Sequence, residues 1–415
     1  MRNWNGWWMI AIIMLIIDFY VFLTIRSVSQ NSSEKIRISI FSLYWIISAG
    51  ALCTIIFFPY IKYFQTHIVA RNYVFTIIVA LFFAKVIAAL FFLVDDLRRG
   101  LLWLMALVFP QTGVDFVSQG KSLSRSAFLS WLGLAAGTGL FGSLLYGFSN
   151  KYNYTVRTIR LKFSNLPAAF RGLKIVQVSD IHSGSFTDKE AVSRGVDLIM
   201  AQNGDLILFT GDLVNDKAEE MENYMDVFSR FRAPLGVFST LGNHDYGDYA
   251  AWPSKQAKAE NLERLIKLEA KLGWKLLMNE HVVLEKDGQQ IALLGVENWS
   301  AFGNFPKYGK LNEAYAGTEK YPFKILMSHD PSHWDAQIRP EYPDIDLTLS
   351  GHTHGMQFGV ENPYFRWSPV QWFYKEWAGL YREGRQVLYV NRGYGFIGYP
   401  GRVGILPEIT VIELT

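Results

Sequence analysis

The chain has 415 residues, with 40 basic and 37 acidic side chains and a formal net charge of +3 at pH 7. A charge this close to balance disfavours nucleic acid as a partner, because nucleic-acid-binding surfaces concentrate basic residues. The single cysteine, Cys53, excludes a disulfide framework, a cysteine-rich zinc site and thiol chemistry within one chain.

Apolar residues are concentrated in the first 150 positions, where four runs are long enough to cross about 30 Å of hydrocarbon as helices. These predicted spans cover residues 7–25, 38–58, 73–94 and 128–148. A further apolar run at residues 101–109 is too short to span and is predicted to be an interfacial or re-entrant piece. The first run is too long for a signal peptide and lacks a cleavage pattern after it, so we expect it to be retained. Residues 1–150 are therefore predicted to form a transmembrane region of about four helices.

Basic residues in short loops predict the orientation of these spans, since such loops tend to remain in the cytoplasm. With four spans, one side holds Arg26, Lys35, Arg37, Arg98, Arg99, Lys121 and Arg125, and the other holds Arg2, Lys62 and Arg71. This bias places both termini outside and predicts an extracytoplasmic C-terminal domain.

Two charged residues, Asp18 and Lys85, interrupt spans that cross in the same direction, and they lie at similar depth. Because an unpaired charge is costly inside a membrane, we predict that they form an ion pair, which is either structural or part of a transport or proton site. Glycines at 133, 137 and 139 in the fourth run predict close helix packing.

From residue 151 to residue 415, short β-rich runs alternate with helical patterns, which predicts an α/β domain with buried sheets. The expected strands lie at residues 173–178, 206–209, 238–241, 291–296 and 323–327. Residues 260–272 repeat apolar side chains at helical spacing with charges between them, which predicts an amphipathic helix on one face of a sheet.

Potential metal ligands follow several of the buried runs. The clusters are Asp180-Ile181-His182, Gly211-Asp212, Gly242-Asn243-His244-Asp245, Ser328-His329-Asp330 and Gly351-His352-Thr353-His354. Open α/β sheets place their sites in loops at the carboxyl ends of strands, so we expect these clusters to meet. The glycines before Asp212, Asn243 and His352 suit tight turns in which the backbone passes close to a bound ion.

The chemistry of these side chains indicates the kind of metal. Imidazole, carboxylate and amide groups without a thiolate suit manganese, iron or zinc. Seven such ligands are too many for one tetrahedral ion, but they fit two ions that share a carboxylate. Two such ions serve displacement at phosphorus: a water shared by both cations loses a proton near neutral pH and attacks in line.

The order and wording of the motifs resemble the calcineurin-like metallophosphoesterase superfamily over about residues 173–414, and within it the bacterial membrane-attached phosphoesterases. The resemblance implies a four-layer αββα sandwich preceded by a transmembrane helical bundle in a bacterial inner membrane. It also implies ligand roles: Asp180, His182 and His354 hold one ion, Asn243, His329 and His352 hold the other, and Asp212 bridges both.

The same resemblance implies that His244 contacts a phosphate oxygen or protonates the leaving group, with Asp245 as its orienting partner. Asp330, next to His329, is predicted to orient a ligand rather than to be one.

We therefore expect a membrane-anchored hydrolase of a phosphomonoester, phosphodiester or pyrophosphate. Aromatic residues gather at residues 299–321 and 364–381, and such loops either contact a substrate or the bilayer or pack on the adjacent sheet. Tethering and these loops favour an amphiphilic or lipid-linked phosphate. Two alternatives stay open. One is hydrolysis of UDP-2,3-diacylglucosamine in lipid A synthesis, a cytoplasmic step that conflicts with the predicted orientation, and the other is a non-catalytic membrane sensor or scaffold that retains the fold.

Overall fold

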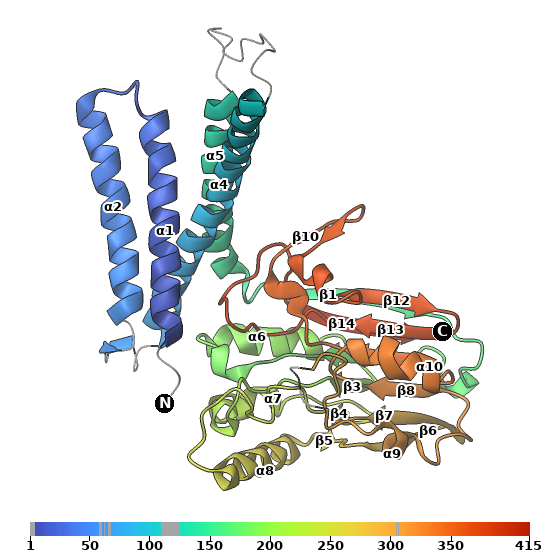
Figure 1. Ribbon diagram of the computed structural model, residues 1–415. Helices are drawn as coiled ribbons and strands as arrows, with labels where there is room; N and C mark the ends of the chain where they lie inside the picture. Colours follow the sequence, from blue (N-terminus) through green and yellow to red (C-terminus); the bar gives the residue numbers. More distant parts are fainter. Residues whose placement is uncertain are drawn as a thin grey trace. The chain divides into compact units, whose positions relative to one another are not determined.

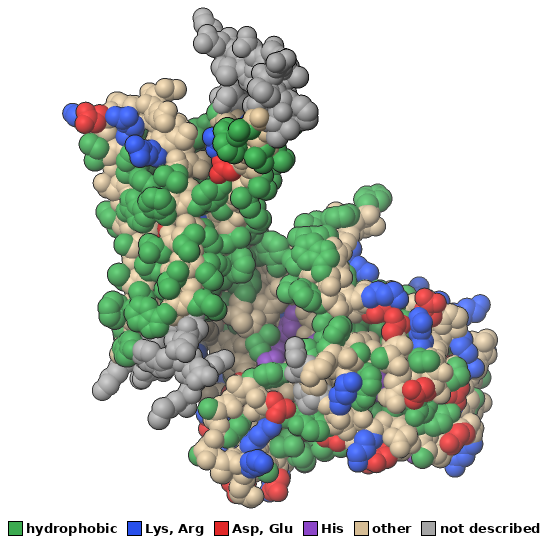
Figure 2. Space-filling model, in the orientation of Figure 1, with side chains coloured by type: hydrophobic (Ala, Val, Ile, Leu, Met, Phe, Trp, Pro, Cys, Tyr) green, Lys and Arg blue, Asp and Glu red, His purple; other side chains and the backbone are tan. Residues whose placement is uncertain are grey.

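The computed structural model describes residues 5–57, 60–61, 63–64, 68–108, 125–303, 305 and 307–415. The chain divides into two compact units, Met1–Tyr146 and Gly147–Thr415 (Figure 1). The first unit contains the long helices α1 (Asn5–Val28), α2 (Glu34–Phe57), α4 (Ile68–Val108) and α5 (Arg125–Gly147). Each includes a stretch long and apolar enough to cross a membrane, and apolar side chains cover the outside of these helices (Figure 2). The prediction of about four long apolar helices in this region is thereby confirmed, and residue 58, the last of the predicted span 38–58, lies outside the described residues.

Helix α4 is longer than predicted. Its 41 residues correspond to about 60 Å of helix, roughly twice the thickness of the hydrocarbon. The helix continues through residues 101–108, so the prediction of a separate piece at 101–109 is wrong, and residue 109 lies outside the described residues. Charged residues do not interrupt the helix because they pair along its surface: Asp95 lies 2.8 Å from Arg98 and 3.3 Å from Arg99.

The predicted ion pair inside the helical unit is confirmed. Lys85 Nζ lies 2.5 Å from Asp18 Oδ1 and also donates to Ser48 Oγ at 2.8 Å. Tyr44 OH donates to the backbone oxygen of Asp18 at 2.7 Å. The two charges therefore satisfy each other together with hydroxyl groups from a third helix, which suits a structural role.

Close packing between α4 and α5 explains part of the glycine pattern. A Cβ atom at Gly137 would lie 2.5 Å from the carbonyl oxygen of Ala84, and one at Gly133 would lie 2.9 Å from Phe91 Cβ. Gly139 faces open space and is not required by packing. The prediction of close helix contact is thus confirmed for two of the three glycines.

The second unit contains two six-stranded sheets (Figure 1). The first sheet has the order β1 (Thr155–Leu161), β14 (Glu408–Leu414), β2 (Lys174–Val178), β3 (Leu206–Phe209), β4 (Val237–Ser239) and β5 (Lys275–Leu276). The second has the order β12 (Gly379–Glu383), β13 (Gln386–Val390), β9 (Leu347–Ser350), β8 (Lys324–Met327), β7 (Gln289–Gly295) and β6 (Glu280–Lys286). Strands β2 to β5 run parallel to one another, as do β13, β9, β8 and β7. A short hairpin, β10 (Val360–Glu361) with β11 (Arg366–Trp367), stands apart from both sheets.

Alternation along the strands produces the layers. Ile175 packs in the core between the sheets, whereas its neighbour Val176 packs in the core beneath the helices. Helices α6 (Lys189–Met200), α7 (Met225–Phe228) and α8 (Lys255–Leu272) cover the outer face of the first sheet. Helix α9 (Leu311–Tyr315) and the π-helical turn η6 (Trp334–Ile338) cover the other face of the second sheet, where Leu311 and Trp334 belong to one buried cluster with Leu294, and the short α10 (Arg339–Glu341) follows η6. The predicted αββα sandwich is confirmed.

Candidate metal centre

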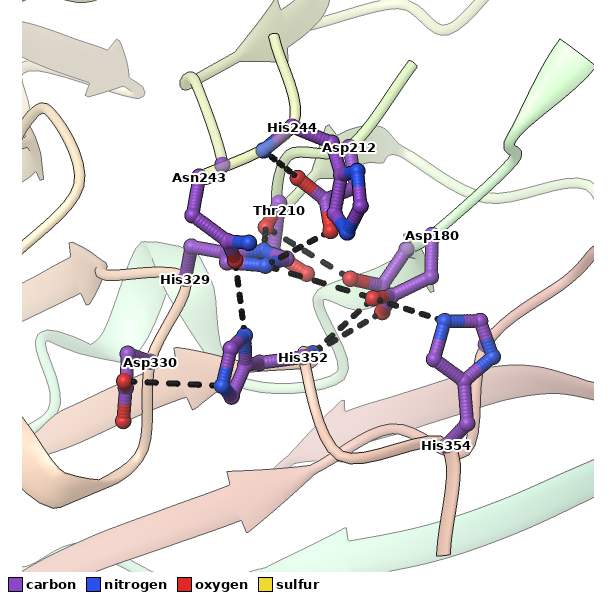
Figure 3. A network of polar contacts seen from close by, with 12 residues as sticks. Asp180, Thr210, Asp212, Asn243, His244, His329, Asp330, His352 and His354 are labelled. Carbon is purple, nitrogen blue, oxygen red and sulfur yellow. Dashed lines mark hydrogen bonds and ion pairs between the residues drawn. The ribbon is translucent and has the colours of Figure 1, made fainter. Parts of the chain in front are cut away.

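One group of predicted ligands is assembled from the loops after β2 and β9 (Figure 3). His182 Nε2 lies 3.0 Å from His354 Nε2, and His354 Nε2 lies 3.3 Å from Asp180 Oδ1. All three residues are buried. Two imidazole nitrogens and a carboxylate oxygen that converge on one point are the donor set of a cation site.

A second group comes from the loops after β3, β4, β8 and β9 (Figure 3). Its candidate ligand atoms, from Asp212, His329 and His352, lie within 4.8 Å of one another. Asn243 joins them because its Oδ1 lies 2.8 Å from His352 Nδ1. Asp212 Oδ2 also lies 3.5 Å from His182 Nε2 of the first group. The structure thus brings all seven predicted ligands together, with Asp212 between the two groups.

The hydrogen bonds of His329 test whether a cation fits. Its Nδ1 lies 2.7 Å from the carbonyl oxygen of Thr210, which can only accept, so Nδ1 carries the proton. Nε2 is buried without a hydrogen-bond partner and lies 3.1 Å from Asp212 Oδ2. Burial lowers the pKa of His329, but the Asp212 carboxylate more than offsets this and raises it to about 10. The pocket therefore favours positive charge between these two side chains, and the donors fit a divalent ion.

Most of the candidate ligands share an uncommon backbone conformation. Five of the seven have positive φ: Asp180 (53°), His182 (50°), Asp212 (62°), His352 (71°) and His354 (50°). Non-glycine residues rarely adopt this region, and each instance costs about 1–3 kcal/mol. Hydrogen bonds between loops hold the conformation: His182 N donates to the carbonyl oxygen of Asp212 at 3.1 Å, and His352 N donates to Asp180 Oδ1 at 3.0 Å.

Two of the predicted glycines permit the loops to approach one another. A Cβ atom at Gly351 would lie 2.2 Å from Asp180 Oδ2, and one at Gly242 would lie 2.2 Å from Asp212 Oδ1. Any side chain would displace these carboxylates. The glycines therefore position the ligands as well as shaping the turns.

His244 lies beside the ligands, and its ring is 5.0 Å from that of His182. Its backbone N donates to Asp212 Oδ1 at 2.9 Å, and its Nδ1 lies 2.7 Å from the carbonyl oxygen of Asn215. Because a carbonyl oxygen only accepts, His244 carries a proton on Nδ1, and its Nε2 remains available to contact a substrate.

The prediction that Asp245 orients His244 is wrong in this structure. The Asp245 carboxylate accepts from the backbone N–H groups of Asp212, Leu213 and Gly242, each at 2.8 Å, and from Val214 at 3.3 Å. Burial and the nearby Asp212 carboxylate raise the pKa of Asp245, whereas four N–H donors favour its charged form. A buried carboxylate needs several donors, and the two turns supply them. Asp245 thus joins the Asp212 loop to the Gly242 turn.

Asp330 orients His352 rather than its neighbour His329. Tyr374 OH lies 2.7 Å from His352 Nε2 and donates to Asp330 Oδ2 at 3.3 Å. Asp330 Oδ2 itself lies 3.6 Å from His352 Nε2. Tyr374 and Asp330 therefore fix the Nε2 side of the His352 ring, and Nδ1 faces Asn243 Oδ1 at 2.8 Å on the side of the other candidate ligands.

Three residues at the centre were missed by the sequence analysis. Tyr249 OH accepts from Asn243 Nδ2 at 2.9 Å, which directs Asn243 Oδ1 toward the ligands, and its place in the same loop was a usable signal. Tyr374 lies within the aromatic segment at residues 364–381, but the sequence did not assign this tyrosine a contact with a metal ligand. Arg402 lies 3.1 Å from His354 Nδ1 and is fully buried, and no local pattern pointed to it.

Comparison with known proteins adds independent evidence. Residues 1–151 match the family model described as "Probable Calcineurin-like phosphoesterase, transmembrane domain", and residues 173–356 match the model described as "Calcineurin-like phosphoesterase". An uncharacterized metallophosphoesterase of Bacillus subtilis (strain 168), YkuE, is 31% identical over 307 residues, which cover 71% of this chain and 98% of the relative. A "Transmembrane protein with metallophosphoesterase domain" from Danio rerio is 29% identical over 372 residues, which cover 81% of this chain and 80% of the relative. Phosphodiesterase YaeI of Escherichia coli (strain K12) is 28% identical over 242 residues, which cover 58% of this chain and 82% of the relative.

Proposed function

Because this chain belongs to the calcineurin-like metallophosphoesterase family, we propose that it is a membrane-anchored hydrolase of an amphiphilic or lipid-linked phosphate ester. The observation that carries the proposal is the convergence of two donor groups from the loops of both sheets, in a chain that also has four apolar helices. A phosphoesterase held at a membrane meets amphiphilic substrates at high local concentration, which supports this substrate class.

Two divalent cations bound here would activate a water for in-line attack and neutralise charge on the phosphoryl oxygens. Asp180, His182 and His354 would hold one ion. Asn243, His329 and His352 would hold the other, and Asp212 would be a ligand shared by both ions. Manganese, iron and zinc suit these donors. The intact donor set argues against a non-catalytic sensor or scaffold.

His244 has the geometry to serve the leaving group. Its Nδ1 proton is held by the carbonyl oxygen of Asn215 at 2.7 Å, so the ring cannot turn freely and Nε2 remains for the substrate. In its protonated form the imidazole would contact a phosphoryl oxygen or give its Nε2 proton to the departing oxygen. Asp245 supports the same loop through backbone N–H groups.

We also propose that the hydrolase domain lies outside the cytoplasm of a bacterial cell, anchored in the inner membrane. The excess of basic residues in the loops on one side of the four spans supports this orientation. A reporter fused after Thr415 tests it, since activity only in the cytoplasm would reject the orientation. In that case UDP-2,3-diacylglucosamine, whose hydrolysis is cytoplasmic, would become the first substrate to examine.

The test of the enzymatic proposal uses the full chain purified in detergent, stripped of metal and reloaded with Mn²⁺, Fe²⁺ or Zn²⁺. Hydrolysis of phosphomonoesters, phosphodiesters and lipid pyrophosphates is then measured. Asp212→Ala and His354→Ala should abolish activity, whereas His281→Ala, which removes an imidazole bonded to the carbonyl oxygen of Ala314, should not. Full activity in the Asp212→Ala protein would reject the assignment.

A further inference from the structure

One segment of the hydrolase begins and ends at the metal centre. Residues 355–373 follow directly after the candidate ligand His354, and the next residue, Tyr374, has its OH 2.7 Å from Nε2 of His352. Ser368 Oγ closes the base of the segment by donating to the carbonyl oxygen of Gly355 at 2.8 Å. The segment therefore connects one candidate ligand, His354, to a tyrosine that contacts another, His352.

The segment presents large aromatic side chains to its surroundings. At the turn of the β10–β11 hairpin, Tyr364 is 97% exposed and Phe365 is 55% exposed. Beyond the hairpin, Trp372 is 69% exposed and Phe373 is 63% exposed. Figure 2 shows apolar side chains gathered over this hairpin, whereas charged side chains are scattered over the remainder of the visible face of this unit. We call these four residues the aromatic patch.

The charges of the segment point away from its tip. Residues 355–373 contain two charged side chains, Glu361 and Arg366. Glu361 pairs with Arg392 at 2.5 Å and with Arg157 at 2.7 Å, and Arg366 donates to Tyr381 OH at 3.2 Å. The four patch residues are themselves uncharged, and the Glu361 carboxylate is neutralised by two arginines, so Arg366 is the one cationic side chain of residues 355–373.

Packing accounts for only part of the aromatic content. Val370 and Trp377 pack with Ile405 in a small buried cluster, against which Tyr374 also lies. Trp367 contacts the ring of Trp372 with 6.0 Å between centroids, which fixes the hairpin to the turn that follows. These contacts hold the base of the segment in place. The side chains of the four patch residues nevertheless remain largely exposed.

We propose that the aromatic patch inserts into the headgroup region of the lipid bilayer that holds the helices of this chain, so that the metal centre works on phosphate esters at the membrane surface. This inference rests on the proposed function and specifies where the enzyme encounters its substrate, at the membrane surface. Helix α5 ends at Gly147 and β1 begins at Thr155, so residues 148–154 are the whole connection, which reaches about 25 Å at most. Tryptophan and tyrosine favour the membrane interface, and uncharged aromatic surface is what that environment accepts.

Fluorescence from a labelled full chain in lipid nanodiscs tests the insertion. In a Cys53→Ser background, Phe365→Cys carries an environment-sensitive fluorophore, and Val283→Cys on β6, 37% exposed at the wild-type valine, is the matched control. Lipids spin-labelled near the headgroup should quench the probe at 365 and leave the probe at 283 unquenched. Equal, weak quenching at both positions would overturn the proposal. Self-quenching that rises with protein concentration, without quenching by lipid, would also overturn it and assign the patch to a second copy of the chain.

Hydrolysis of two matched diesters tests the consequence for catalysis. Hexadecyl p-nitrophenyl phosphate enters the bilayer, whereas methyl p-nitrophenyl phosphate stays in water. Tyr364→Ser with Phe365→Ser should lower kcat/KM for the hexadecyl ester by about tenfold and leave the methyl ester unchanged, and Val283→Ser should change neither. An unchanged ratio in an active enzyme would refute the docking and leave the proposed function standing. If the metal-loaded wild-type enzyme cleaves no phosphate ester, the proposed function fails, and the quenching result still decides whether the patch is inserted.

Discussion

Replacement of Asp245 by asparagine separates its structural role from a catalytic one. The Asp245 carboxylate is fully buried and accepts four backbone N–H groups, three at 2.8 Å and one at 3.3 Å. An amide offers one accepting oxygen, so Asp245→Asn turns an NH₂ group toward two of these donors. A buried donor without a partner costs about 1–3 kcal/mol, so for two donors we expect the hydrolase unit to lose about 2–6 kcal/mol of stability.

Metal affinity should fall with stability, because Asp245 holds the loop that carries Asp212. Loss of a group that positions a ligand typically weakens metal binding by about 10–100-fold. The assay is competition between the purified chain and a fluorescent metal indicator, with thermal unfolding measured on the same samples. Asp188→Asn is the matched control, since Asp188 accepts from Ala191 N at the start of α6 and asparagine serves equally well there.

The outcome distinguishes a structural role of Asp245 from a role in orienting His244. Normal metal affinity and normal stability, together with a lower kcat and a shifted pH profile, would refute the structural reasoning. They would instead restore Asp245 as the residue that orients His244. Weak metal binding with a lower unfolding temperature would confirm that Asp245 joins two ligand loops.

Three further predictions follow from buried charges. Burial raises the pKa of Glu269 from 4.5 to about 8, so the folded chain keeps a proton that the unfolded chain releases, and stability should fall as the pH rises from about 4.5 to 8. Glu269→Gln should therefore raise the unfolding temperature of the hydrolase at about pH 8 more than at about pH 5, and a pH-independent effect, or the same effect in the exposed Glu263→Gln, would contradict this. In the helical unit, Lys85→Met leaves Asp18 unpaired and should lower the yield of folded protein in detergent, whereas adding Asp18→Asn should recover it; equal yields in all three proteins would show that the pair contributes little. Chelation should abolish hydrolysis and lower the unfolding temperature, because the carboxylates of Asp180 and Asp212 lose their counter-charge, and Mn²⁺ or Zn²⁺ should restore both; activity that survives exhaustive chelation would exclude a metal-dependent mechanism.

The position of the metal centre could be predicted because of sheet geometry. Strands β2, β3 and β4 are parallel neighbours, so Asp180, Asp212 and Asn243 emerge at one edge of one sheet. Strands β8 and β9 bring His329 and His352 to the same place from the other sheet. Buried strands followed by polar residues are visible in the sequence, and the packing of the two sheets brings these polar residues together.

The errors arose where a side chain acts across long distances in the sequence. Asp245 was assigned to its neighbour His244, but its partners include residues 212–214, which belong to another loop. Arg402 reaches His354 from 48 residues away. Local patterns carry no information on such partners, because any nearby donor would look equally suitable. The separate piece predicted at residues 101–109 had a different cause, because that run is too short to span alone, whereas in the structure α4 continues through residue 108.

The strained backbone of the ligands indicates how the centre tolerates substitution. Asp180 is held at φ 53° by its own backbone N, which donates to the carbonyl oxygen of Gly211 at 2.9 Å, and its carboxylate accepts from His352 N at 3.0 and 3.1 Å. These bonds join loops to one another, so the shape of the centre depends on its side chains as well as on bound metal. Asparagine at position 180 keeps an acceptor for His352 N and tolerates positive φ. Alanine has no side-chain acceptor and tolerates positive φ less well. Asp180→Asn should therefore lose metal affinity while the fold is retained, and Asp180→Ala should lose both, which a comparison of unfolding temperatures in chelator would reveal.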